Sequence, residues 1–379
     1  MIYTNFQELK LSMLGMGGMR FPCHPDGQVD MEKTGELIDM CIRSGINYFD
    51  SAWFYHHGKA EEVIGSLLKK YPRGSYYLAT KLPWSGYDTA EGMKKLFYTQ
   101  LERTGAGYFD FYLLHNVSDD NVAIFTDPKL GILDFLLEQK QKGIIRHLGF
   151  STHGSLKMME SFLQEYHSVL EFCQIQLNWL DWKLQDAKAK VEMLNRYNLP
   201  IWVMEPVRGG SLAALTPEHE ARLKAIRPEE SIAAWSFRFL QSIPGIQMIL
   251  SGMGTPEQIA DNIRTFSEHK PLNAEEQAVL LEIADNLLAQ KTLTCTRCKY
   301  CVDDCPAGLE IPKLLALYND MCLLHDQLDV ARLEKEVDRE HFPTACVGCQ
   351  TCESKCPQNI HISEIMSDFT EKIQKKEHA

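Results

Sequence analysis

Short apolar runs alternate with longer amphipathic segments over residues 10–268. The runs predict β-strands, because they are rich in β-branched and aromatic residues and are bounded by glycine or polar residues. The segments between them follow the period of helices that bury one face, as in Glu32–Arg43, Ala60–Lys70, Ile132–Lys142 and Pro256–Phe266. The predicted strands are Met13–Gly15, Asn47–Ser51, Tyr76–Lys81, Phe109–His115, His147–Ser151, Cys173–Asn178, Ile201–Glu205 and Gln247–Ser251.

This alternation is a strand–helix unit repeated eight times, which favours an α/β fold built as a closed (β/α)8 TIM barrel. An open doubly wound sheet usually has fewer strands. The glycine-rich loop Leu14–Gly18 does not match G-x-G-x-x-G, because Arg20 stands at the third glycine position. We therefore interpret it as a turn after the first strand, with a Rossmann phosphate loop as the alternative.

The pattern changes after the eighth unit. A helical connector is predicted over Asn273–Gln290, followed by two cysteine-rich runs with a helical segment, Ile311–Glu340, between them. The chain is thus expected to hold a barrel over 1–270, a connector over 271–290 and a small, mainly α-helical ferredoxin-like domain over 291–379.

Composition and charge narrow the function classes. The chain has 379 residues, of which 45% are hydrophobic, and a net charge of −12 that no basic block interrupts. Nucleic acid and anionic membrane surfaces are therefore not expected partners. The sequence has neither a long apolar stretch nor a signal-peptide pattern at Met1–Asn5, so we expect a cytoplasmic protein.

Eight of the twelve cysteines stand in two runs with the same spacing. Disulfide frameworks belong to short secreted chains, so clustered cysteines in an enzyme of this length indicate metal. Structural zinc sites are one alternative, but they leave the Cys-Pro ending of both runs unexplained. The runs are Cys295-x2-Cys298-x2-Cys301-x3-Cys305-Pro306 and Cys346-x2-Cys349-x2-Cys352-x3-Cys356-Pro357.

The repeated spacing resembles bacterial ferredoxins that carry two 4Fe–4S clusters, in which the fourth cysteine of each run ligates the other cluster. The resemblance implies one cluster on Cys295, Cys298, Cys301 and Cys356. It implies a second cluster on Cys346, Cys349, Cys352 and Cys305. The runs lie farther apart than in small ferredoxins, and Cys322 on the helical segment between them is expected to be a core thiol.

Polar residues follow three neighbouring predicted strands. Asp50 ends the second strand with Tyr55 in the loop beyond it, Lys81 ends the third and His115 ends the fourth. Singly, each has a structural explanation, such as a helix cap or a surface charge. Together they converge on the carboxyl end of a barrel, where barrel enzymes carry their active sites.

The barrel region resembles the aldo-keto reductase family, whose members reduce carbonyls or oxidise alcohols with a nicotinamide cofactor bound across the barrel mouth. The resemblance implies that Tyr55 is the general acid, that Lys81 favours its phenolate, that Asp50 holds Lys81, and that His115 orients the substrate oxygen. The matching strings are NYFDSAWFY (47–55), YLATK (77–81), FDFYLLH (109–115), LGFSTH (148–153), QIQLN (174–178), EPVRGG (205–210) and SGMGTPEQIADN (251–262).

The same resemblance implies the cofactor contacts. Ser151 and Gln174 are expected to bind the nicotinamide carboxamide, while Met204 stands where many members stack an aromatic ring. The positions expected to face the extra phosphate of NADP hold uncharged residues, which predicts weak discrimination between NAD and NADP. Arg208 and Arg264 are the alternative ligands for this phosphate. The remaining predicted contacts are Pro206 and Val207 after the seventh strand, and Gly252, Met253, Gly254, Gln258 and Asn262 at the last loop and helix.

Two functions remain open on the sequence. The first is an NAD(P)H-dependent carbonyl reductase carrying two 4Fe–4S clusters for structure or for electron transfer to a partner protein. The second is an iron–sulfur electron-transfer protein whose barrel is only a docking scaffold. Nicotinamide delivers two electrons together whereas each cluster accepts one, and the sequence has no recognisable flavin motif to split the pair.

Overall fold

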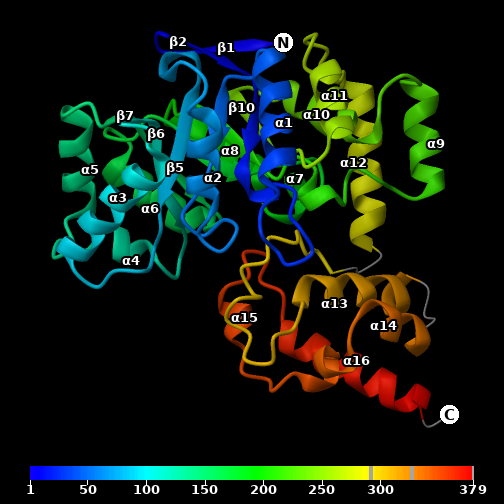
Figure 1. Cartoon of the computed structure of the whole chain (residues 1–379). Helices are drawn as coiled ribbons and strands as arrows, with labels where there is room; N and C mark the ends of the chain where they lie inside the picture. The colour runs from blue at the N-terminus through cyan, green and yellow to red at the C-terminus, as the bar shows by residue number, and fades with distance from the viewer. Residues whose placement is uncertain (290–292, 325–327, 378–379) are drawn as a thin grey trace. The chain divides into compact units, whose positions relative to one another are not determined.

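A computed structural model describes residues 1–289, 293–324 and 328–377 of the chain (Figure 1). Contacts divide the chain into two compact units. The first unit comprises Met1–Val207 and Leu215–Gln277, and the second comprises Arg208–Ala214 and the chain from Ala278 onward. The division falls within the predicted connector, whose last residue lies outside the described residues, as do residues 291 and 379 at the predicted limits of the C-terminal domain.

The first unit is a closed barrel of parallel strands in the order β10-β3-β4-β5-β6-β7-β8-β9. All eight predicted strands are present, so the (β/α)8 prediction is confirmed. Because both faces of these strands are covered, they form nearly continuous apolar runs. The strands are β3 Leu14–Gly17, β4 Tyr48–Asp50, β5 Tyr77–Leu82, β6 Phe109–Val117, β7 Ile145–Thr152, β8 Cys173–Gln176, β9 Ile201–Met204 and β10 Ile246–Ser251.

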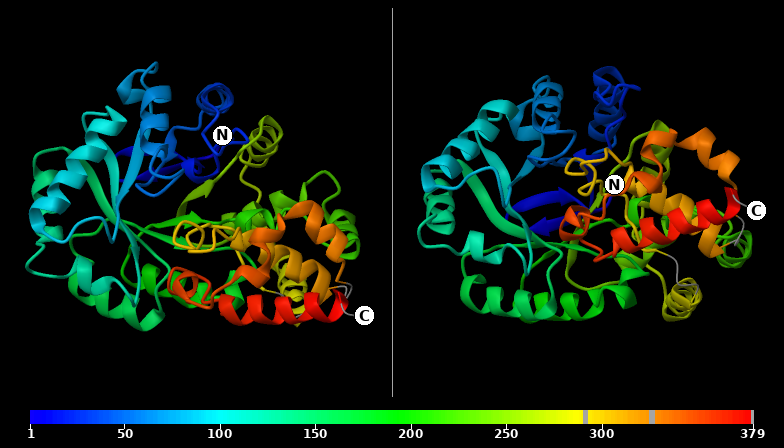
Figure 2. Two further views of the ribbon diagram at one scale, coloured as in Figure 1. Left: turned by 60° about the horizontal axis from the view of Figure 1, so that its bottom comes forward. Right: turned by 90° about the horizontal axis from the view of Figure 1, so that it is seen from below.

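Helices surround the ring of strands on its outside (Figure 2). Several begin at a residue whose side chain accepts a backbone N–H, such as Thr255 at α11. The helices are α1 Met31–Arg43, α2 Ala60–Leu68, α3 Ala90–Thr104, α4 Val122–Phe125, α5 Ile132–Gln141, α6 Leu156–Tyr166, α7 Asp181–Leu184, α8 Ala187–Arg196, α9 Pro217–Ile226, α10 Ile232–Gln241 and α11 Pro256–Thr265. A further helix, α12 Ala274–Ala289, contains the division between the two units.

An antiparallel hairpin that we did not predict, β1 (Tyr3–Phe6) and β2 (Leu9–Ser12), precedes the barrel. Its side chains join the apolar core inside the barrel, where the Phe6 ring centroid lies 5.1 Å from that of Trp202. Trp202 is the second residue of β9, so this packing fills the amino-terminal end of the barrel. The opposite end carries the polar residues.

The described part of the second unit is helical around its own apolar core. Its helices are α13 Ile311–Tyr318, α14 Val330–Glu336, α15 Thr351–Ser354 and α16 Ile362–Glu377. Leu314, Leu333 and Met366 form part of this core. Cys322, predicted to be a buried core thiol, packs against the core but is only half-buried. None of the described helices is long and apolar enough to cross a membrane.

Candidate active site and cysteine clusters

The fold brings the four predicted catalytic residues together at the carboxyl end of neighbouring strands. Asp50 is the last residue of β4, Lys81 is next to last in β5, and His115 lies in β6. Tyr55 lies in the loop that follows β4. All four are buried, with exposures of 2% for Asp50, 9% for Tyr55, 1% for Lys81 and 3% for His115.

The ammonium group of Lys81 connects this set. It donates to Asp50 Oδ1, to the carbonyl oxygen of Ser51 at 2.7 Å and to Tyr55 Oη at 3.5 Å. An ammonium group has three donors, so these acceptors fix its direction completely. The third donor is thereby aimed at the tyrosine hydroxyl.

Burial shifts the pKa values of Asp50, Lys81 and His115. Burial raises the pKa of Asp50 and lowers the pKa of Lys81, and the attraction between the two opposes both shifts. The pKa of His115 is held well below its usual value, mainly by burial and further by the charge of Lys81. His115 is therefore a neutral imidazole at neutral pH, and its Nδ1 has no hydrogen-bond partner among the described residues.

A buried hydrogen-bond network, which we did not predict, holds the backbone of Lys81 in place. Gln100 Nε2 donates to the backbone oxygen of Lys81 at 3.0 Å and to Glu61 Oε1 at 2.6 Å. The hydroxyl of Thr80 donates to the same Glu61 oxygen at 2.6 Å. Burial raises the pKa of Glu61, and in the sequence it looks like an ordinary acid in the first turn of a helix.

Aromatic rings form a wall beside His115. The ring centroid of Trp84 lies 5.6 Å from that of His115 and 4.8 Å from that of Phe54. Phe54 in turn lies 6.0 Å from His115. A substrate oxygen bonded to His115 would thus have apolar surface next to it.

The two residues predicted to bind the carboxamide lie on adjacent strands, in register with each other. Ser151 is buried, and its Oγ already accepts the backbone N–H of Asn116 at 2.8 Å. Gln174 is also buried, and its Oε1 has no hydrogen-bond partner in the described part of the chain. An unsatisfied buried acceptor is costly, and the NH2 of a carboxamide would satisfy it. The residues present therefore fit a nicotinamide ring.

The residues predicted to contact the cofactor at β9 lie at the end of this strand and at the start of the loop that follows. Met204 ends the strand half-buried, Pro206 is buried and Val207 is half-buried. Glu205 between them takes a left-handed backbone conformation with φ of 56°. None of these side chains offers an aromatic ring, so a flat aromatic stack on nicotinamide is not available from this segment.

The predicted phosphate loop is already ordered by its own residues. Gln258 Oε1 accepts the N–H of Gly254 at 2.8 Å, and Asn262 Nδ2 donates to Ser251 Oγ at 3.1 Å. Met253 is buried, whereas Gly252 is exposed. The loop leads into α11, whose N-terminal N–H groups suit an anion.

A basic residue that the sequence did not assign to this loop lies against it. A Cβ on Gly252 would come within 2.5 Å of Arg20 Cγ, so the Arg20 side chain crosses the loop. Of the two arginines considered for the phosphate, Arg264 is paired with Asp261. Arg208 is buried and bonded to Thr294 and Gln358, so both of these arginines already have partners within the chain.

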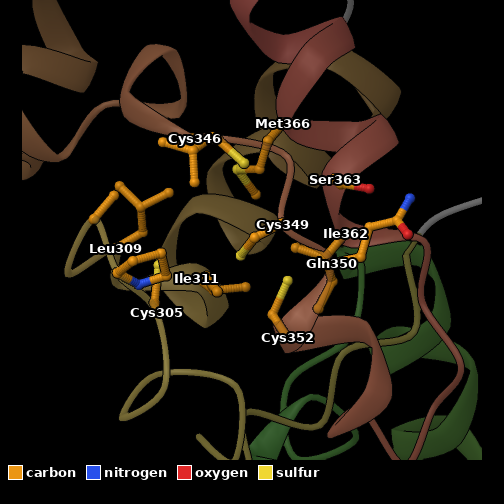
Figure 3. A pocket seen from close by; sticks show the side chains of 13 residues that line it. Cys305, Leu309, Ile311, Cys346, Cys349, Gln350, Cys352, Ile362, Ser363 and Met366 are labelled. Atoms are coloured by element: carbon orange, nitrogen blue, oxygen red, sulfur yellow. The ribbon is translucent and has the colours of Figure 1, made fainter.

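The eight cysteines of the two runs fall into two groups, each drawing one member from the other run. Burial raises the pKa of Cys301, and the next contributions come from Cys298, Cys295 and Cys356. The second group lines a pocket that is partly open to solvent (Figure 3). Its cysteines are Cys305, Cys346, Cys349 and Cys352.

The donor set of each group fits an iron–sulfur cluster. Four thiols, surrounded by apolar residues such as Leu309, Ile311 and Met366 in the second group, are the ligands that 4Fe–4S clusters use. Burial raises the pKa of Cys352 to about 11. A metal centre deprotonates a thiol that coordinates it. Among the described residues, no three His, Cys, Asp or Glu side chains are placed to hold a single metal ion.

The barrel, the buried Asp–Lys–Tyr contact and the separate cysteine-rich unit define the class of this protein as an oxidoreductase with an iron–sulfur domain. A family model described as aldo/keto reductase family matches residues 13–285, and one described as 4Fe-4S dicluster domain matches 294–361. The first match covers most of the chain. The chain therefore belongs to the aldo/keto reductase family.

Individual proteins match this chain at low sequence identity. The chain is 23% identical over 306 residues to an uncharacterized oxidoreductase YqkF of Bacillus subtilis, covering 72% of this chain and 92% of that one. It is 23% identical over 328 residues to the NADH-specific methylglyoxal reductase of Escherichia coli, covering 74% and 97%. An aldo/keto reductase from Klebsiella pneumoniae, solved with NADP and acetate, has a TM-score of 0.61 at 17% identity, covering 75% and 93%, and shares the fold.

Proposed function

We propose that this protein reduces carbonyl compounds, and oxidises the corresponding alcohols, with NADH or NADPH. The observation that carries the proposal is the buried contact from Asp50 through Lys81 to Tyr55, with neutral His115 beside it. Such an array has a proton donor, a group that stabilises the donor's anion, and a hydrogen-bond donor for the substrate oxygen.

Nicotinamide, when bound, supplies hydride to the carbonyl carbon. The chain's own residues manage the charge that this creates on oxygen. Tyr55 Oη gives its proton to that oxygen, and Lys81, fixed at 3.5 Å, stabilises the tyrosinate that remains. His115 donates an N–H to the same oxygen and orients it, and Gln174 holds the carboxamide through its buried Oε1.

The substrate class follows from the wall beside His115. Phe54 and Trp84 present apolar surface next to the reacting oxygen, which favours aldehydes and ketones with an apolar substituent of modest size. The relative described as a methylglyoxal reductase adds 2-oxoaldehydes to the compounds worth testing.

We further propose that the C-terminal unit holds two 4Fe–4S clusters with crosswise ligation. Cys295, Cys298, Cys301 and Cys356 would hold one, and Cys305, Cys346, Cys349 and Cys352 the other. Such clusters exchange single electrons, and a redox partner protein is one recipient. Reduced thiols in this number suit the cytoplasm.

The test is NAD(P)H oxidation, followed by absorbance, with a panel of aliphatic, aromatic and 2-oxo aldehydes and ketones. It is run on anaerobically prepared holoprotein, on the same protein after cluster removal, and on Lys81→Met. Turnover in the first two samples and its loss in the third support carbonyl reduction. Equal rates in Lys81→Met, or no turnover with any compound, would favour the alternative of an electron-transfer protein with a scaffold barrel.

A further inference from the structure

Arg208 is the most buried arginine of the described chain, with 2% exposure. It follows β9 in the chain but belongs by its contacts to the C-terminal unit. Its Nη1 donates to the backbone oxygen of Thr294, and its Nη2 donates to Gln358 Oε1 at 2.7 Å.

The two acceptors stand next to cluster cysteines from different runs. Thr294 directly precedes Cys295, and Gln358 follows Cys356 and its proline. Those two cysteines fall in the same group, together with Cys298 and Cys301. One guanidinium therefore joins the two segments that must meet to complete this ligand set.

The backbone at Arg208 is also unusual. Its φ is 49°, a left-handed conformation that non-glycine residues seldom adopt. Glycine would fit this conformation more easily, so the structure around the site must hold the arginine in place. The bonds to Thr294 and Gln358 supply that restraint.

A nearby cation stabilises the more negative of two charge states. A cubane held by four thiolates carries net negative charge, which grows by one unit on reduction. We propose that Arg208 is a positioning residue for the cluster of Cys295, Cys298, Cys301 and Cys356. It holds the ligand segments together, and its charge makes that cluster easier to reduce. This inference rests on the cluster ligation proposed above but not on the carbonyl chemistry.

The test is an anaerobic redox titration of the full chain, monitored by electron paramagnetic resonance, with iron and sulfide measured on the same samples. Arg208→Gln removes the charge, and Arg208→Lys keeps the charge but loses the paired donors. Arg297→Gln is the matched control, because Arg297 lies between Cys295 and Cys298 but is exposed. The second cluster serves as an internal reference.

We expect one of the two transitions in Arg208→Gln to move to lower potential by at least 59 mV, a tenfold change in the one-electron reduction constant. Arg208→Lys should move less, and Arg297→Gln should stay near wild type. Unchanged midpoints in Arg208→Gln with full iron would overturn the proposal, as would an equal shift in Arg297→Gln. Wild-type protein without iron would overturn the ligation itself.

A second variant keeps the proposal testable where Arg208→Gln does not fold. Gln358→Glu leaves the arginine in place and sets a carboxylate against its guanidinium, which cancels the charge. We expect the same downward shift of the same transition. A wild-type midpoint in Gln358→Glu would contradict the electrostatic role, whatever carbonyl activity either protein shows.

Discussion

Replacing Tyr55 by phenylalanine should separate the proposed catalysis from folding in this protein. The change removes one hydroxyl, whose contact with Lys81 Nζ at 3.5 Å is the longest of the three that the ammonium makes. The ring keeps its place, 5.1 Å from the same nitrogen and 6.0 Å from the His115 ring. Removing one hydrogen bond of this kind changes stability by about 0.5–1.5 kcal/mol.

The effect of Tyr55→Phe on turnover should be far larger than its effect on stability. General acid catalysis is typically worth about 10²–10⁴-fold. At 1.36 kcal/mol per tenfold, that is a rise of about 2.7–5.4 kcal/mol in the barrier to carbonyl reduction. The affinity for NAD(P)H should not change, because no predicted cofactor contact involves this hydroxyl.

The assay combines stopped-flow NAD(P)H oxidation with one good aldehyde, fluorescence titration of the cofactor, and urea unfolding. Tyr71→Phe is the matched control, since it loses a half-buried hydroxyl that bonds Asp39 and lies just beyond the carboxyl end of α2. A rate for Tyr55→Phe within threefold of wild type would refute Tyr55 as the proton donor. A large loss in Tyr71→Phe as well would point to general destabilisation.

Four further outcomes are expected. Lys81→Met leaves a buried carboxylate without its cation, so urea unfolding should show a loss of about 3–5 kcal/mol at neutral pH, and an unchanged midpoint would contradict the ion pair. Burial, aided by a nearby lysine, lowers the pKa of His153 to about 3. The unfolded chain therefore binds the extra proton first, and stability should fall as pH drops below about 6.5, by up to about 1.36 kcal/mol per unit. His153→Gln should flatten that slope in unfolding curves taken from pH 7 to 4, and an equal slope would exclude it as the cause. Anaerobic wild type should hold about eight irons and eight sulfides per chain, and Cys305→Ser should damage the cluster on the second cysteine run; stoichiometric zinc instead would refute the clusters. Wild type should use NADH at least comparably to NADPH, and Arg20→Gln should lower kcat/KM for NADPH more than for NADH; equal effects on both would mean that Arg20 does not contact the extra phosphate.

The barrel could be predicted from the sequence, and so could the approach of its polar residues, because the carboxyl ends of parallel strands lie at the same end of a barrel. Asp50 and Lys81 each lie at or next to the carboxyl end of adjacent strands, so their approach follows from strand order alone. The hairpin β1–β2 could not be predicted, since strands of four residues give too short a pattern. Its role in filling the barrel depends on contacts with strands far away in the sequence.

The missed residues share one property: their partners are distant in sequence. On the sequence Arg208 is an alternative ligand for the cofactor phosphate, yet in the fold it bonds groups 86 and 150 residues away. Glu61 stands in the first turn of a helix, where acids are usually solvated, but it is fully buried against Thr80 and Gln100. Local pattern carries no information on such pairs, so only the fold reveals them.

The number of electrons transferred argues against a role for the clusters in the proposed carbonyl reduction. In the proposed reaction hydride carries two electrons directly to the carbonyl carbon. The groups proposed to manage the resulting charge, Asp50, Tyr55, Lys81 and His115, all belong to the first unit. Nothing in that step requires a one-electron carrier. Carbonyl reduction should therefore survive cluster removal, provided the barrel stays folded. A rate that fell in proportion to lost iron, with the barrel still folded by circular dichroism, would instead mean that single electrons pass through the site, and the proton-transfer scheme would need a radical step.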